Sequence, residues 1–459
     1  MNIRPDMNRR QFLQTTALAA SALPFMGAFT GPLSTLDSSS ISDQLKRFAA
    51  EKTVQAIVAA KAEARDMLPE FESLFAAAEK GDWPGLKNIW QELLEQSSPF
   101  QISGPGDWRA QGIQSKIAQE IYGAFENIMG GEDDFAIVFG RDIIGSIPSG
   151  SIYFGGTDPG RFVITALCRS QVNGDPFFTL TQNALADRSY LQYVRSMYGA
   201  RIYVPTDEDL EHALGQYLED ALRRRKENKL KNCEGVRVID GKVHVSGAVA
   251  VMSINGLLAE IIFDKNPDRE FYVEESFPLE WMYPHLAPHG LIMKIHRQPL
   301  AELPDELVRR DREFWTRYIQ AMIGDWLHDT SISDVVAFIE KVHVNHNLSG
   351  FRGDPRFIQN DAPQKSFSKL RSSIAGIYAW RASNAVRAVE KERMLAEADF
   401  AYRQAIALCP RGMDALFRYT SLLGWQGRTE AAVALVESAL KLQPQNVALL
   451  NLFQQLVVG

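Results

Sequence analysis

The residues with the most chemical content form a turn in the first half of the chain. Residues 152–161 read Ile-Tyr-Phe-Gly-Gly-Thr-Asp-Pro-Gly-Arg, so an apolar run stops at two glycines and a helix start follows. Thr157 or Asp158 can serve as the N-cap, and Pro159 suits the first helical turn. A strand, a tight turn and a helix N-terminus present backbone N–H groups to an anion. The segment therefore predicts where a ligand lies, without naming a reaction.

The composition of this turn limits the ligands it suits. It is neither a G-x-G-x-x-G fingerprint nor a phosphate loop, because no Gly-Lys-Ser/Thr follows. The carboxylate of Asp158 would repel an anion, whereas it would suit a sugar hydroxyl or a metal. The alternative interpretation is a plain strand-to-helix turn with an N-cap and no ligand.

Two further apolar runs also end in polar residues: Gln182 and Asn183 follow one, and Glu274 and Glu275 follow another. In open α/β sheets, ligands bind outside the carboxyl ends of parallel strands. If the three ends converge, they form a pocket with backbone donors, one arginine, an amide pair and acids. The candidate ligand-binding residues are Gly155, Gly156, Thr157, Asp158, Arg161, Gln182, Asn183, Glu274 and Glu275.

The two adjacent glutamates could supply a general acid or base, since neighbouring carboxylates can push their pKa values apart. Adjacent strand residues point to opposite faces, so only one of Glu274 and Glu275 should face the cleft. The alternative is that they are helix-capping acids before Pro278.

Other reactive side chains lack the spacing that chemistry requires. Neither His285 and His289 nor His343 and His346 have the additional ligands that define a zinc site, so no metal is predicted. No Gly-x-Ser-x-Gly elbow occurs, and Cys168 has no obvious partner for nucleophilic catalysis.

The elements that must position these residues alternate between short apolar runs and helical patterns. This alternation predicts βαβ units and a mostly parallel sheet with flanking helices. The expected strands are 135–139, 151–154, 177–181, 201–204, 271–273 and 291–295. The expected helices are 161–171, 189–197, 207–225, 248–264 and 279–286. Asp240-Gly241, between two alternating runs, predicts a hairpin over 236–245.

Helical patterns flank this block on both sides. Residues 41–129 have the helical period, including a helix hairpin that breaks at Gly81 to Pro84. After the block, 304–344 and 366–397 are helical, and 345–364, rich in Asn, Gly, Asp and Pro, indicates a long loop.

The C-terminal region contains a repeat of 34 residues, the period of tetratricopeptide repeats. Such helices present a concave face to a protein partner or pack on their own domain. An unrelated array of helical hairpins is the alternative. The residues that recur at this spacing are Ala398 and Ala432, Ala405 and Ala439, and Pro410 and Pro444.

The N-terminus resembles a twin-arginine export signal, because Arg9-Arg10-Gln11-Phe12-Leu13 precedes the uncharged apolar stretch 15–29. The prediction is a periplasmic or cell-envelope protein whose mature chain has no transmembrane span. An amphipathic helix or a membrane anchor is the alternative. The net charge of −7 argues against nucleic-acid binding. The basic run 223–226 suits a solvated helix end.

Five segments carry a resemblance to a known family. They are 153–162, 181–187, 271–276, 281–284 and 367–372. They resemble the soluble portion of large bacterial membrane proteins, the protein O-mannosyltransferase-like glycosyltransferases of a family of unknown function, over roughly 135–380. In those proteins a multi-spanning membrane region precedes this portion, whereas here the export signal stands in its place. The resemblance implies a link to protein glycosylation and assigns no catalytic residue.

Together these observations predict an exported α/β protein with an N-terminal helical region and C-terminal tetratricopeptide-like repeats. The expected role is binding of a glycan or small molecule, or assembly with a protein partner. The alternative is a stand-alone enzyme acting on a sugar or phosphate compound through Asp158, Arg161 and one of the two glutamates. The expected divisions are 1–30 for the signal, 31–130 for the helical region, 131–300 for the α/β domain, 301–378 for a helical connector and 379–459 for the repeats.

Overall fold

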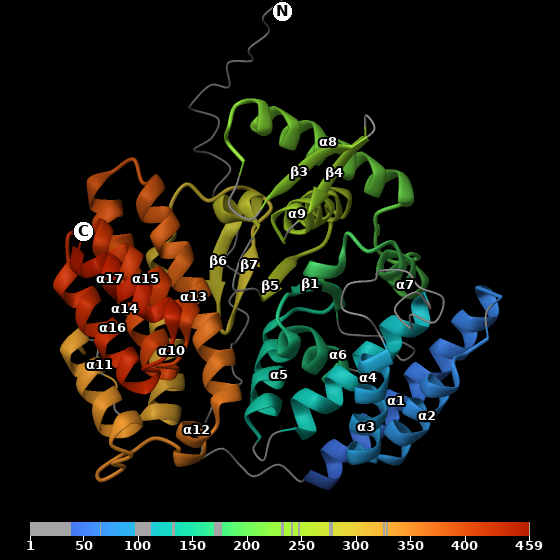
Figure 1. The fold of residues 1–459 in the computed structure, drawn as a ribbon, viewed down its shortest axis with the longest axis horizontal. Coiled ribbons are helices and arrows are strands. Elements are labelled where there is room, and N and C mark those ends of the chain that lie inside the picture. The colour runs from blue at the N-terminus through green and yellow to red at the C-terminus, as the bar shows by residue number, and fades with distance from the viewer. Residues whose placement is uncertain are drawn as a thin grey trace, which may run out of the picture. The chain divides into compact units, whose positions relative to one another are not determined.

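A computed structural model gives the fold, in which helices surround one mixed sheet (Figure 1). The residues that it describes are 38–64, 66–96, 112–130, 134–168, 177–230, 234–239, 242–246, 248–274, 279–324, 326 and 329–458. The predicted export signal, the Asp240-Gly241 turn and Glu275 lie outside these residues.

The described chain begins with the helices α1 (Ser38–Ala62), α2 (Pro69–Lys80), α3 (Trp83–Gln96) and α4 (Ile113–Met129), and α5 (Phe135–Ser146) follows them before the sheet. The predicted helix hairpin is confirmed, since Gly81 ends α2 with a φ of 74°, which favours glycine. A buried Lys52 bonds Glu120 and Tyr193, and this network joins α1, α4 and α7 (Arg188–Tyr198).

The central sheet has five strands in the order β2-β1-β5-β7-β6. Its strands are β1 (Ile152–Gly155), β2 (Phe178–Thr181), β5 (Phe271–Glu274), β6 (Leu286–His289) and β7 (Ile292–Ile295). β1 pairs in parallel with β2 and β5, while β7 pairs antiparallel with β5 and β6. The sheet is therefore mixed, and the expectation of a mostly parallel sheet is corrected. The antiparallel half arises because β6 and β7 form a hairpin at Gly290, whose φ is 61°.

Two of the expected strands are not strands. Residues 135–139 belong to helix α5 (Phe135–Ser146), where Phe139 and Ile143 are both buried at helical spacing. A short apolar run suits a buried helix as well as a strand, so its composition alone could not decide. Residues 201–204 form no strand in the described chain: Arg201 and Ile202 belong to the turn after α7, and the Asn266 amide bonds both backbone groups of Tyr203, at 2.8 and 3.1 Å.

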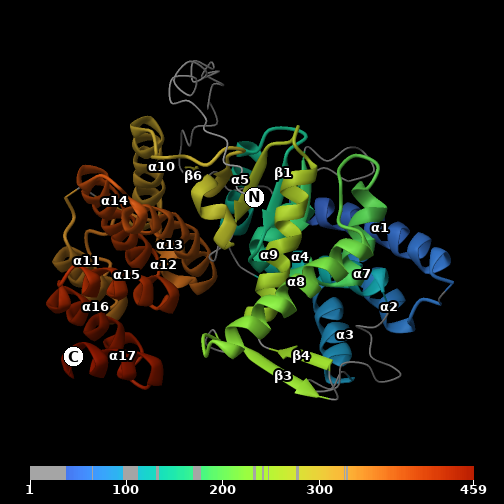
Figure 2. The same cartoon turned by 90° about the horizontal axis from the view of Figure 1, so that it is seen from above.

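Most of the segments that connect the strands of the sheet are helical. The expected helix 161–171 is a π-helical turn, η2 (Pro159–Val163), that runs into α6 (Ile164–Leu167). The expected helix 279–286 is a short 3₁₀ helix, η4 (Glu280–His285), that leads into β6. The predictions of α7, α8 (Asp207–Lys226) and α9 (Ala248–Lys265) are confirmed, as is the hairpin of β3 (Gly235–Ile239) and β4 (Lys242–Ser246) (Figure 2). The 3₁₀ turn η3 (Gln182–Ala184) follows β2.

The rest of the described chain is helical. Its elements are α10 (Asp305–Ile323), α11 (Ile332–Phe338), η5 (Ile339–Val344), α12 (Pro355–Gln359), α13 (Asp361–Asn384), α14 (Ala388–Leu408), α15 (Met413–Trp425), α16 (Thr429–Leu442) and α17 (Val447–Val458). The expected loop 345–364 contains α12 and the start of α13, because the side chains of Asp354 and Asn360 cap these helices. Consecutive helices from α13 to α17 pack on one another, and α10 and α13 contact the β6 edge of the sheet. Membership of the tetratricopeptide class stays a prediction.

Candidate functional site

The turn after β1 binds a carboxylate, and that carboxylate belongs to the chain itself. Glu274, at the end of the neighbouring strand β5, is buried. Its Oε2 accepts hydrogen bonds from the backbone N–H groups of Gly156 and Thr157, at 3.2 and 3.1 Å. The donors that the sequence assigns to an external anion are therefore occupied by Glu274.

Thr157 and Gly160 complete this arrangement. The Thr157 hydroxyl donates to Glu274 Oε1 at 2.9 Å and accepts from the Gly160 N–H at 3.0 Å, so Thr157 caps the helical turn as predicted. A Cβ atom placed on Gly160 would lie 1.8 Å from Glu274 Oε2. Because two atoms cannot approach so closely, the carboxylate can occupy this position only against a glycine.

Asp158 and Arg161 are paired with each other. Asp158 Oδ1 accepts from Arg161 Nη2 at 2.7 Å and from Nε at 3.2 Å. The guanidinium also lies over the Phe162 ring, 4.2 Å from its centroid. This pair removes the free acid and free cation that the catalytic interpretation needs.

Of the amide pair after β2, Asn183 belongs to the same network and the Gln182 side chain does not. Asn183 Nδ2 donates to the Gly156 carbonyl at 2.9 Å, and Asn255 of α9 in turn donates to the Asn183 carbonyl at 3.1 Å. Gln182 is fully buried, and within the described part of the chain neither amide atom of its side chain has a hydrogen-bond partner.

The structure thus brings together the three strand ends that the sequence singles out. Glu274 and Asn183 both bond the turn, as convergence of the parallel strands β2, β1 and β5 requires. Their polar groups bond one another, whereas the sequence analysis expects them to face a ligand. Glu275 lies outside the described residues.

The outer side of the turn lines a cavity of about 540 Å³, which we call the basic cavity. The opposite wall comes from α13 and from the loop before α15, and it supplies the cations Lys365, Lys369 and Arg411. Its lining residues are Gly156, Thr157, Asp158, Pro159, Lys365, Ser366, Ser368, Lys369, Arg411, Gly412, Met413, Asp414 and Ala415.

These cations were not among the residues predicted from the sequence. The only available signal was the four-residue spacing of Lys365 and Lys369, where Lys365 immediately precedes the predicted helix 366–397 and Lys369 lies within it. Arg411 follows the repeat proline and carried no signal of its own.

The first residues of helix α15 also line the basic cavity. Gly412 is its N-cap, and no side chain caps the helix. The first N–H groups of a helix have no intrahelical acceptor and carry partial positive charge. Near Arg411, burial first and then that guanidinium lower the pKa of His343 to about 4, so this imidazole is neutral near neutral pH.

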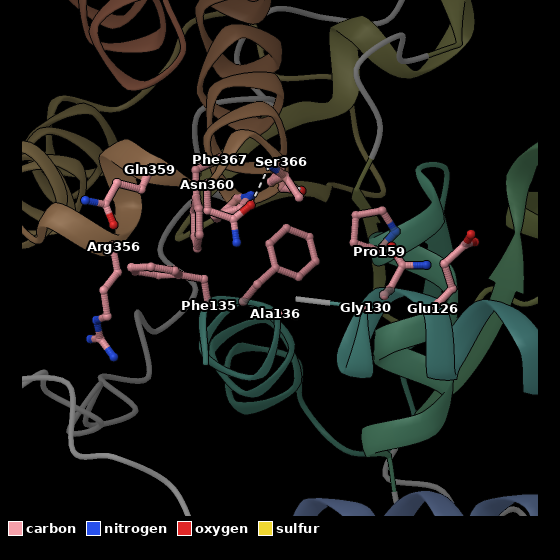
Figure 3. A pocket seen from close by; sticks show the side chains of 14 residues that line it. Glu126, Gly130, Phe135, Ala136, Pro159, Arg356, Gln359, Asn360, Ser366 and Phe367 are labelled. Atoms are coloured by element: carbon pink, nitrogen blue, oxygen red, sulfur yellow. Dashed lines mark hydrogen bonds between the residues drawn. The ribbon is translucent and has the colours of Figure 1, made fainter. Parts of the chain in front are cut away.

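A second cavity of about 620 Å³ adjoins the first, and both are lined by Pro159 and Ser366. We call this second space the aromatic cavity and the two together the groove. Figure 3 shows Phe135, Ala136 and Phe367 facing the aromatic cavity, with Glu126 and Pro159 on one side and Gln359 and Asn360 on the other.

Aromatic contacts connect the helices on the two sides of the groove. Phe139 of α5 packs edge-on against Phe367 of α13, and their ring centroids are 5.8 Å apart. Phe135 packs in the same way against Phe357, at 5.4 Å. These contacts fix the two walls relative to each other.

The described residues contain no cluster of three or more side chains suited to a metal. Among the described helices, none is both long and apolar enough to cross a bilayer. No family model, curated protein or solved structure matches the chain significantly, so the groove and the turn are interpreted from their own geometry.

Proposed function

We propose that this protein is a binding protein of the cell envelope, and that its ligand occupies the groove. One observation carries the proposal: Gly156 to Pro159 line a cavity whose opposite wall holds three cations. The volumes of about 540 and 620 Å³ lie within the usual range for small-molecule sites.

The geometry favours binding over catalysis. Glu274 is held by the turn's backbone donors, and Asp158 and Arg161 hold each other. A general acid or base must be able to reach the proton that it transfers. The alternative of a stand-alone sugar or phosphate enzyme is weaker, since Asp158, Arg161 and Glu274, the described residues that it requires, already have partners.

The envelope location and the link to glycosylation rest on the sequence. The Arg9-Arg10 signal supports export, and the resemblance to the soluble portion of mannosyltransferase-like proteins supports a ligand that contains or accompanies a glycan. The helices α14–α17 supply a surface on which a protein partner could act in the same assembly.

The test is to block the groove at a residue that both cavities share. Ser366 donates to the carbonyl four residues earlier, at 3.0 Å, and lines both cavities. Ser366→Trp should fill the groove and abolish the stabilisation that ligands give in a thermal-shift screen of sugars, sugar phosphates and nucleotides. A ligand present at 100 times its Kd stabilises the folded protein by about 2.7 kcal/mol, which such a screen detects.

Ser383→Trp is the matched control. Ser383 lies on the same helix, is exposed, and makes the same bond to the carbonyl four residues earlier, at 3.0 Å. Its variant should keep every thermal shift of the wild type. Ligand shifts that survive Ser366→Trp would refute the groove as the binding site.

A further inference from the structure

Three cations line one cavity and form no ion pair with Asp158 or Asp414, the two acids that also line it. Lys365 and Lys369 stand one turn apart on α13, and Arg411 lies on the loop before α15. Within the described chain none of the three forms an ion pair, whereas Arg312, Arg371 and Arg403 of the C-terminal helices each pair with an acid. Like charges one helical turn apart repel by about 0.2–0.5 kcal/mol. The three cations also outnumber the acids at this wall, so its net charge is positive.

The acids near this wall do not offset it. Asp158 is neutralised by Arg161. Asp414, in the first turn of α15, and Asp361, one turn before Lys365, form no ion pair with the three cations in the described chain. The uncapped start of α15 adds its N–H groups to the same wall.

We infer that the basic cavity binds a phosphomonoester group of a small molecule, an inference that rests on the proposed binding function. A phosphomonoester carries a charge of about −1.5 to −2 at neutral pH and three acceptor oxygens, which matches several cations and backbone donors better than one carboxylate does. The Asp158 carboxylate, on the other wall, can accept hydrogen bonds from hydroxyls of the same molecule. The aromatic cavity next to it has room for the rest of the ligand.

The test is calorimetric titration of the full chain with glycerol 3-phosphate, inorganic phosphate, acetate and glycerol. Glycerol 3-phosphate should bind most tightly, inorganic phosphate more weakly, and acetate and glycerol not measurably. Lys365→Ala/Lys369→Ala should weaken glycerol 3-phosphate at least tenfold, and Arg411→Ala should weaken it to a similar extent. All three side chains are at least partly exposed, so the variants should keep the wild-type melting temperature.

The control variant removes two charges elsewhere. Lys61 and Lys87 are exposed on α1 and α3, and neither lines the basic cavity. Lys61→Ala/Lys87→Ala should change the affinity less than twofold. An equal loss in both double variants, or no binding of glycerol 3-phosphate by the wild type, would overturn the inference. If glycerol 3-phosphate does not bind, but a neutral ligand gives a thermal shift that Ser366→Trp abolishes, the phosphate inference fails while the proposed binding function stands.

Discussion

At the scale of single residues, Glu274 decides what the turn after β1 can do. Its carboxylate occupies the position in which an external anion would be bound, and Gly160 leaves the space that it needs. A backbone N–H group buried without an acceptor costs about 1–3 kcal/mol. Glu274 is therefore a structural ligand of the turn.

Glu274→Ala should lower the free energy of unfolding by about 2–4 kcal/mol, since it leaves the Gly156 and Thr157 N–H groups without an acceptor. Urea denaturation of the purified protein measures the change. Glu280→Ala, at an exposed position of η4, should stay within about 0.5 kcal/mol of the wild type. Equal stability of the two variants would contradict the structural role.

His343 should make stability depend on pH. Its pKa is lowered to about 4, chiefly by burial, and its Nε2 has no hydrogen-bond partner within the described residues. The unfolded chain binds a proton at this imidazole below about pH 6.5, whereas the folded chain binds it only near pH 4. The stabilisation is therefore complete above pH 6.5 and is lost as the pH falls toward 4.

His343→Gln should reduce the loss of stability between pH 7 and pH 5 by about 1–2 kcal/mol, because Gln does not titrate. Urea midpoints at the two pH values give this number. His212→Gln, at an exposed position of α8, serves as the control and should keep the wild-type pH dependence. If His343→Gln lost as much stability between pH 7 and pH 5 as the wild type, His343 would not be the group responsible for the pH dependence.

At the scale of elements, helix α13 holds the C-terminal helices to the sheet. Arg371 of α13 is fully buried, and its Nη1 donates to both oxygens of Asp311 in α10, at 3.0 and 2.8 Å. Tyr378 donates to the same aspartate at 2.9 Å, and Gln404 of α14 accepts from Arg371 Nε at 2.7 Å. One buried ion pair thus connects three helices.

Removing one partner of this pair should be costly. Arg371→Met or Asp311→Asn should each lower the free energy of unfolding by about 3–5 kcal/mol, because the remaining group stays buried without its charge partner. The double variant Asp311→Asn/Arg371→Met should lose clearly less than the sum of the two single losses, since it leaves no unpaired charge. Chemical denaturation of the four proteins forms a double-mutant cycle, and strict additivity would show that the pair is not coupled.

The elements that could be predicted from the sequence are those whose hydrophobic residues follow a clear local period. The long helices and the alternating runs of the β3–β4 hairpin have a clear period, and they are where they were expected. The first turn of α5 was mistaken for a strand, because five apolar residues do not distinguish a buried strand from a buried helix. β6 was not predicted as a strand, since the expected helix 279–286 ended at its first residue and its pairing with β7 depends on a tertiary contact.

At the scale of the whole molecule, the candidate site could be predicted only in part. Parallel pairing of β1 with β2 and β5 brings their carboxyl ends together, so the convergence of three strand ends followed from local patterns. The cations of the basic cavity could not be predicted from local patterns. Lys365 and Arg411 come to line the same cavity as the turn only when α13 and the loop before α15 pack near it. No spacing in the sequence encodes that contact.

The predicted export route can be tested at the same scale. Replacing Arg9 and Arg10 together by Lys should abolish appearance of the protein in the periplasm, because the twin-arginine pair is the recognised feature of such a signal. Cell fractionation followed by immunoblotting measures this. The control Arg47→Lys creates a pair of adjacent lysines with Lys46 outside the signal, and it should be exported like the wild type. Export of the Arg9→Lys/Arg10→Lys variant would refute the twin-arginine route.

The bond between Glu274 and the turn has a consequence for the order in which the chain acquires its structure. The two partners are 118 residues apart, so the turn leaves the ribosome long before its acceptor is made. Until β5 arrives, β1 lacks one neighbouring strand and the Gly156 and Thr157 N–H groups lack their carboxylate. Chains truncated before residue 271 should therefore remain sensitive to protease around the turn, and resistance should appear only once β5 has been synthesised.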